Sequence, residues 1–422
     1  MSNAVPGGLT VAAFNAWRAT LSAACASLIG IGFARFAYTA LLPAIIGAHW
    51  FAPATAAYLG AANLGGYLAG ALGARVLARR AANVTILRAM MLLAVAAFFA
   101  CAWPISFAWF FGWRFASGFA GGVLMVTAAP SVLAHVSASR RGIVSGAIFA
   151  GVGLGIAASG TLVPLLLRQG LAQTWIGLGM LSLVLTAIAW RGWPANPAVA
   201  ASPGTTVHPE HRPDSPLALR SLYVEYALNA VALVPHMIFL VDYVARGLGK
   251  GLDAGANYWV LYGLGAIVGP VFTGHLADRI GFARALRVAY VAQMCAVVLP
   301  ALGLGLPALI VSSIVMGAFT PGIVPLVLGR ANELLAHHPA SQKAAWSTAT
   351  TSFATLQAGA AYGLSFLFAA TSGNYSLLFL VGGAAMAIGL LVNVSSARLA
   401  RARRTQCHAA SNATVAPHAS RR

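Results

Sequence analysis

Long apolar runs separated by short polar stretches repeat from one end of the chain to the other. Each run has about 20 residues or more, the length that an α-helix needs to cross roughly 30 Å of hydrocarbon. This pattern predicts an all-α integral membrane protein with transmembrane helices at twelve places, near 14–44, 54–78, 84–103, 107–135, 141–167, 172–191, 218–245, 255–277, 285–304, 306–334, 343–370 and 374–397. Because lipid cannot satisfy freed backbone groups, we expect helices that contain proline to bend against neighbouring helices.

One long polar stretch, 193–217, divides the runs into two sets of six. It is rich in Pro, Ser and Ala, which is typical of a flexible linker. The segment GALGARVLARRAA from Gly70 and the segment GHLADRIGFARAL from Gly274 match at a constant offset and occupy equivalent places in the two sets. We therefore expect an N-terminal six-helix bundle (1–192), a cytoplasmic linker (193–217), a C-terminal six-helix bundle (218–398) and a basic cytoplasmic tail (399–422).

Composition supports a membrane location. The 422 residues are 59% hydrophobic and 8% charged, with a mean hydropathy of +0.81, whereas soluble domains have about 25% charged residues. Of the 26 Lys and Arg residues, only Arg168, Arg246 and Lys250 fall in loops on one side, and nearly all others fall on the opposite side. This positive-inside distribution predicts a multi-pass membrane protein with both termini cytoplasmic. We expect its location to be a bacterial inner membrane.

The net charge of +19 is explained by these topology signals, so we expect no nucleic-acid partner. Four cysteines are far apart and fit neither a disulfide framework nor a metal site. The sequence contains no phosphate-binding glycine loop, no nucleophile–base constellation and no zinc-ligand spacing. We therefore expect no metal, no cofactor and no enzymatic activity.

Two motifs resemble a known family. GHLADRIGFARAL is similar to the cytoplasmic-loop signature of the major facilitator superfamily, and GFARFAYTALLP, from Gly32, resembles the first helix of its YbfB/YjiJ-type branch. The resemblance implies two pseudo-symmetric six-helix bundles around a central cavity that opens alternately to each side of the membrane. It also implies a secondary transporter.

The loop signature contains a candidate conformational latch. Gly274 would let two helices approach closely, and Asp278 would pair with Arg279, Arg284 or a helix end. The alternative is that the arginines only fix topology. The first-half copy has Ala74 in place of the aspartate, so we expect a weak latch or none there.

Glycine spacings mark two further spans. Arg114, Gly118 and Gly122 lie four residues apart on one face of the fourth span, a pattern similar to one in the superfamily whose arginine is implicated in coupling; a structural pairing role is the alternative. In the fifth span, Gly151 and Gly155 resemble part of an exporter-associated glycine motif, although Ile156 replaces its proline. All four glycines fit close helix packing.

Ionisable residues inside spans are the remaining candidates. Arg35 lies in the first span and is expected to face the cavity, a substrate or a buried partner such as Glu225. Glu225 in the seventh span is the candidate coupling carboxyl. His236 either hydrogen-bonds in the pore or packs structurally. Tyr38 is included with this substrate and coupling group, and Asp242 is expected at the outer rim. Asn63, Asn229 and Gln357 are weaker candidates for a polar cavity lining.

We therefore expect a monomeric, proton-coupled secondary transporter of a small organic solute, with export slightly favoured. The arginines of the first and fourth spans favour an anionic substrate. The main alternative is a proton symporter that imports an organic acid. A non-transporting membrane enzyme or sensor is a distant alternative, because the chain has only seven acidic residues with which to build an intramembrane catalytic site.

Overall fold

The computed structural model describes residues 15–136, 141–194, 216–336 and 338–415, and almost all of them are helical. The first half contains α1 (Ala16–Ser27), η1 (Leu28–Phe33), α2 (Ala34–Gly47), α3 (Pro53–Arg80), α4 (Asn83–Ala100), α5 (Phe107–Leu133), α6 (Arg141–Leu167) and α7 (Leu171–Ala189). The second contains α8 (Pro216–Val234), η3 (Pro235–Phe239), α9 (Leu240–Asp242), η4 (Tyr243–Gly247), α10 (Gly251–Ile280), α11 (Phe282–Val298), η5 (Leu299–Leu302), α12 (Leu306–Leu334), α13 (Pro339–Ala370) and α14 (Tyr375–Val415).

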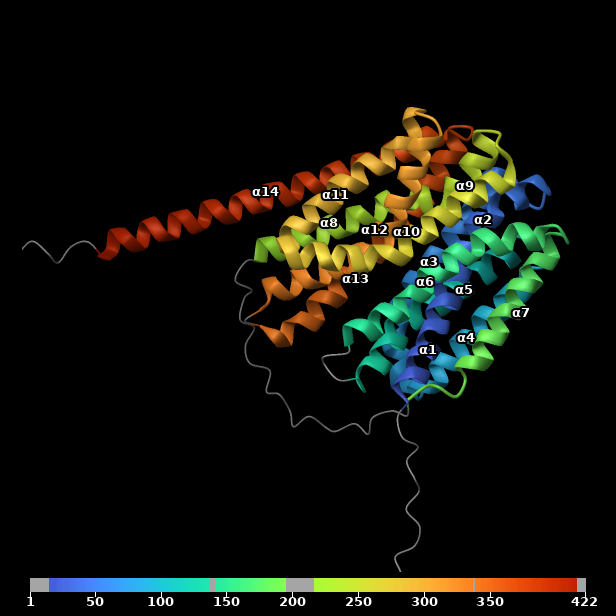
Figure 1. Cartoon of the computed structure of the whole chain (residues 1–422), viewed down its shortest axis with the longest axis horizontal. Helices are drawn as coiled ribbons and strands as arrows, with labels where there is room; N and C mark the ends of the chain where they lie inside the picture. The colour runs from blue at the N-terminus through green and yellow to red at the C-terminus, as the bar shows by residue number, and fades with distance from the viewer. Residues whose placement is uncertain (1–14, 137–140, 195–215, 337, 416–422) are drawn as a thin grey trace, which may run out of the picture.

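Each predicted span coincides with helix, within a few residues at most ends. Eleven of the described helical stretches are long and apolar enough to cross a membrane. The predicted second span is α3, which has 28 residues rich in glycine and alanine and completes the set of twelve. The last helix, α14, continues well past the predicted end of its span and extends away from the bundle (Figure 1). The predicted linker falls almost wholly outside the described residues, as does the end of the predicted tail.

The first helix of each half contains a π-helical segment. Residues Ala16–Gly47 form one continuous helical stretch in which η1 separates α1 from α2. The seventh span has the same construction, because η3 begins at Pro235 in its middle and η4 ends it. A π segment widens the helix by one residue and changes the direction of the side chains that follow. In the first span, Arg35 follows η1 almost directly.

The helices form two bundles with matching internal contacts (Figure 1). In the first bundle α3 packs on α5, and in the second α10 packs on α12. The two bundles meet where α3 packs on α13 and where α6 packs on α10. The pseudo-symmetry relates these two contacts to each other. The interrupted first and seventh spans also pack on each other. The twelve-span, two-bundle prediction is confirmed.

The bundles share a core in one half of the molecule only. We call the half in which α1 and α8 begin the inner half and the other the outer half. In the outer half, one hydrophobic cluster joins both bundles and includes Phe36, Leu41, Phe239 and Trp259. In the inner half, the two bundles have separate cores. The bundles are therefore closed against each other at the outer side and diverge toward the inner side (Figure 1).

Candidate functional site

Arg35 lies where the two bundles meet. Its Nη2 donates a hydrogen bond to Oε1 of Gln357 on α13, and the Gln357 amide also contacts Sδ of Met237 at 3.6 Å. The guanidinium lies over the ring of Tyr67, 5.1 Å from the ring centroid, and 5.5 Å from that of Phe36. Aromatic faces stabilise cations at such distances. Arg35 was predicted to face the cavity, a substrate or a buried partner. In the structure its side-chain partner is Gln357 of the other bundle.

A group of aromatic side chains from both bundles surrounds this arginine. The Phe36 ring lies 5.9 Å from the ring of Trp259 on α10, and Trp259 stacks on Tyr262 at 4.8 Å. The Trp259 indole donates to Oγ of Ser159 on α6 at 3.0 Å, which ties α10 to the first bundle. Arg35 is thus surrounded mainly by aromatic rings, which offer large apolar faces and few hydrogen-bond acceptors.

The charge of Arg35 has no acidic counterpart nearby. Residues 1–209 contain no Asp or Glu, so its own bundle cannot supply a carboxylate. Among the described residues, both ion pairs lie in the second half. The Nε of Arg35 is buried and has no hydrogen-bond partner in the described part of the chain, whereas the side chain as a whole is partly exposed. This is an incompletely paired cation in the middle of a membrane protein.

Arg114 occupies a different environment. It is 2% exposed and donates from Nη1 to the Ala34 carbonyl at 2.7 Å, with the Tyr38 ring 4.4 Å away. The amide of Asn63 donates to the same carbonyl at 3.2 Å. The Tyr38 hydroxyl donates to the Ala56 carbonyl at 2.7 Å. These contacts fit the structural alternative for Arg114, since it binds backbone next to η1 and is shielded from solvent.

Glu225 lies away from Arg35. Its carboxylate accepts a hydrogen bond from Nδ2 of Asn393 on α14 at 2.8 Å, and Oδ1 of Asn393 accepts from Nε of Arg287 on α11 at 2.8 Å. Glu225 is 2% exposed. Glu225, one of the alternatives left open as a partner of Arg35, is not paired with it here: the carboxyl belongs to a network inside the second bundle, because that side of α8 faces α11 and α14.

His236 and Asp242 are both fully buried. Nε2 of His236 lies 2.7 Å from Oγ of Ser312, and its ring meets the Phe379 ring edge-on at 5.1 Å, which is the packed alternative. Asp242 pairs with Arg246 at 3.1 Å and accepts from the Tyr375 hydroxyl. Asp242 was expected at the outer rim, and that is wrong. It is the last residue of α9, and its side chain points toward Tyr375 on α14 in the core.

The predicted latch is not formed in this arrangement. A Cβ atom at Gly274 would meet no atom within 4 Å, so the close helix approach expected there is absent. Asp278, Arg279 and Arg284 are exposed and take part in none of the ion pairs found in the described chain. The reason is the divergence of the inner halves, which leaves Gly274 without a close neighbour among the described residues.

The predicted packing glycines lie at close helix contacts. A Cβ on Gly155 would come within 2.6 Å of Cα of Gly32 in η1, and one on Gly151 would overlap the Ala24 carbonyl. Gly118 and Gly122 on α5 lie in the same way against the backbone of α3. The fifth span thus packs directly on the π segment that precedes Arg35.

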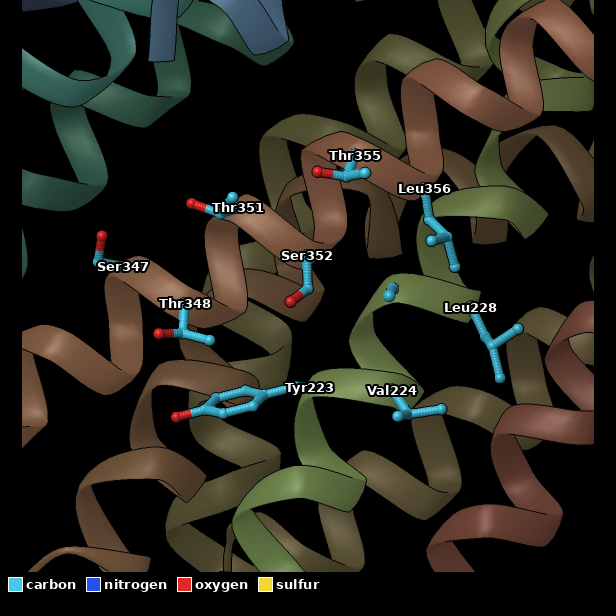
Figure 2. Close-up of a pocket in the computed structure, with 10 residues that line it drawn as sticks. Tyr223, Val224, Leu228, Ser347, Thr348, Thr351, Ser352, Thr355 and Leu356 are labelled. Carbon is cyan, nitrogen blue, oxygen red and sulfur yellow. The ribbon is translucent and has the colours of Figure 1, made fainter. Parts of the chain in front are cut away.

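A groove lies between α8 and α13, away from Arg35. Its volume is about 560 Å³. Figure 2 shows its hydroxyl side chains along α13 and Tyr223, Val224 and Leu228 along α8. Thr355 in this groove precedes Gln357 by two residues, so the two side chains point to nearly opposite sides of α13. The groove is therefore separate from the surroundings of Arg35.

Comparison with known families gives a decisive result. The family model described as "Uncharacterised MFS-type transporter YbfB" matches residues 27–394. The chain belongs to this family of major facilitator superfamily transporters. The resemblance found in its motifs is confirmed, and the protein is a secondary transporter rather than an enzyme.

Solved transporters share the fold. The nucleoside transporter NupG, solved as a point mutant, matches with a TM-score of 0.70 at 12% identity, over 90% of this chain and 99% of that one. The xylose transporter XylE from E. coli, in a partially occluded inward-open conformation, matches with a TM-score of 0.70 at 12% identity, over 89% and 96%. A bacterial homologue of the lysosomal transporter Spinster matches with a TM-score of 0.63 at 15% identity, over 93% and 98%. No curated protein sequence matches significantly.

Several residues around Arg35 were missed, or identified only weakly, by sequence reasoning. Tyr67, Trp259 and Tyr262 were visible only as aromatics in spans, where packing roles are common. Gln357 was one polar residue among several, and nothing in the sequence linked it to a position 322 residues earlier. The one signal available was its polarity within a long apolar run.

Proposed function

We propose that this transporter moves a small organic anion across a bacterial inner membrane by alternating access, coupled to protons, with Arg35 binding the anionic group. It acts as a monomer with both termini in the cytoplasm, and export is the favoured direction. The observation that carries this proposal is the partly exposed Arg35 with an unpartnered Nε in a bundle without acidic residues, as far as the chain is described.

The argument for an anion is energetic. Removing an arginine from water is costly unless hydrogen bonds or an opposite charge compensate for it. Gln357 offers Arg35 one neutral acceptor, and the rings of Tyr67 and Phe36 contribute weaker attraction. A carboxylate or phosphate would accept from the remaining donors in the forked geometry that guanidinium favours. The flat aromatic surroundings suit an anion with an apolar body.

The arrangement of the bundles supports alternating access. The shared outer core blocks the outer side, while the inner halves diverge. This corresponds to an inward-facing state. Closure of the inner side would bring the exposed Asp278 and its neighbouring arginines toward the first bundle, so the latch belongs to the outward-facing state in this proposal.

Coupling is assigned to the buried carboxyls of the second bundle. Glu225 and Asp242 each lie in the interrupted seventh span and each contact α14. Ionisable groups inside spans are commonly used in proton relays. Export is favoured because the fifth-span glycines Gly151 and Gly155 resemble part of the exporter-associated motif.

Transport in proteoliposomes tests the proposal. In right-side-out vesicles that are acidic outside, we expect the pH gradient to drive efflux of a preloaded anionic substrate. The Glu225→Gln and Asp242→Asn variants should each lose this gradient dependence and retain substrate exchange. Transport that persists after the pH gradient and the membrane potential are collapsed would contradict coupling. A gradient that drives uptake rather than export would contradict the direction and favour the organic-acid symporter instead.

A further inference from the structure

A basic groove lies at the inner end of the first bundle. It has a volume of about 650 Å³ and lies between α1, α4 and α7. Arg18 and Arg191 line its mouth, and Leu92 and Leu183 line its deeper part. Leu183 precedes Arg191 by eight residues, which corresponds to about 12 Å along a helix. The groove therefore runs from the membrane surface into the apolar part of the span.

The arginines at the mouth have no acidic partner in the described part of the chain. Both side chains are exposed, and neither makes a hydrogen bond or ion pair with another described residue. The whole bundle contains no Asp or Glu, so no rotamer change can provide one. A third arginine, Arg88, is already bound: it donates to the Trp190 carbonyl at 2.6 Å, and its guanidinium lies 4.8 Å from the Trp190 ring.

The Arg88 contact gives the groove a fixed wall. It holds Trp190, which is 37% exposed, at the mouth, and Trp17, the neighbour of Arg18 in sequence, is 72% exposed. Exposed tryptophans at the end of a span are typical of the level of lipid headgroups. Below them, the exposed side chains of Leu21, Leu92 and Leu183 form an apolar floor. From the membrane surface inward, the groove thus presents positive charge, then indole rings, then aliphatic side chains. This order matches the phosphate, the headgroup region and the acyl chains of a phospholipid.

We infer that this groove binds an anionic phospholipid of the inner leaflet, with its phosphate between Arg18 and Arg191 and an acyl chain along Leu92 and Leu183. Basic pockets between helices at this side of a membrane are suited to acidic headgroups. The inference uses only the membrane side on which α1 begins, so it stands independently of the proposed substrate and coupling. A bound lipid would tie α1 to α7 and so support the helix that carries Arg35.

Native mass spectrometry of the detergent-purified full chain tests this inference. The probes are phosphatidylglycerol and phosphatidylcholine with identical acyl chains. We expect the wild type to retain phosphatidylglycerol preferentially and the Arg18→Gln/Arg191→Gln variant to bind it roughly tenfold or more weakly. The Arg18→Lys/Arg191→Lys variant keeps the charges and should retain the preference.

Two further variants separate this site from general charge effects. Arg220→Gln/Arg398→Gln removes two exposed arginines from the same side of the second bundle and should bind lipid as the wild type does. Ala187→Trp fills the groove with its arginines intact and should reduce retention. Equal retention of the two lipids by the wild type, or unchanged retention in Arg18→Gln/Arg191→Gln, would overturn the inference.

Discussion

Arg35 on α2 donates a hydrogen bond to Gln357 on α13, so a cation of one bundle is held by a neutral amide of the other. An amide satisfies one guanidinium donor without cancelling the charge. The contact can therefore join the bundles in this arrangement and still yield to a stronger, charged acceptor. This relationship underlies the first prediction.

Gln357→Glu should weaken anion binding and raise the thermal unfolding midpoint. The new carboxylate would supply Arg35 with an internal counter-ion, and hydrogen bonds to charged groups contribute about 1.5–3 kcal/mol. That is enough to weaken a competing anion roughly tenfold or more. Ligand-induced thermal shifts measure the effect, with Gln357→Leu as the control that removes the amide and leaves the arginine open. Unchanged anion binding in Gln357→Glu would show that substrate does not compete for Arg35.

The two arginines inside the membrane spans should respond oppositely to neutral replacement. Arg114→Met removes the hydrogen bond from the charged guanidinium to the Ala34 carbonyl, and hydrogen bonds to charged groups contribute about 1.5–3 kcal/mol. The unfolding midpoint should fall. Arg35→Met removes an incompletely paired charge, so the midpoint should stay or rise while function is lost. A larger loss of stability in Arg35→Met than in Arg114→Met would reverse these assignments.

Gly155→Val should destabilise the transporter, because its Cβ alone would come within 2.6 Å of Cα of Gly32. Overpacking of this kind typically costs about 1–3 kcal/mol. Gly146→Val on the same helix is the matched control, since a Cβ there meets no atom within 4 Å. Equal unfolding midpoints for the two variants would mean that α6 does not depend on close contact with η1.

Alternating access predicts opposite distance changes at the two sides. Spin labels at Gly146→Cys and Gly274→Cys report on the inner ends of α6 and α10, and labels at Gln169→Cys and Lys250→Cys report on their outer ends. The labels are placed in a background without the native cysteines and measured by pulsed electron–electron double resonance. In the outward-facing state the inner distance should be shorter and the outer distance longer. Distances that change in the same direction would contradict rocking of the bundles about the site.

The sequence predicted the fold well because each span has to satisfy one strong requirement. A membrane helix needs about 20 consecutive apolar residues, and such a run can be recognised from the local sequence alone. The repeat around Gly70 and Gly274 then divided the chain. The interruption η1 left no comparable sign, whereas η3 begins at Pro235, where the sequence predicts a bend.

The site was less predictable because its partners are distant in the chain. Arg35 stood out as a charge in an apolar run, but its contact with Gln357 depends on how α2 and α13 approach each other. Glu225 was equally conspicuous, yet the rotation of α8 turns it to Asn393 instead of Arg35. Sequence polarity identifies which residues need partners, while helix rotation determines which partners they find.

Binding of matched acids and amides tests the central claim most directly. Calorimetric or thermal-shift titrations of the purified protein with a panel of small organic carboxylates and their neutral amides should give binding of carboxylates only. Arg35→Lys should bind more weakly, Arg35→Gln should lose binding, and Arg168→Gln, which changes an arginine at the outer side, should match the wild type. Equal binding of acids and amides, or carboxylate binding that survives in Arg35→Gln, would contradict the assignment of Arg35 as the anion-binding residue.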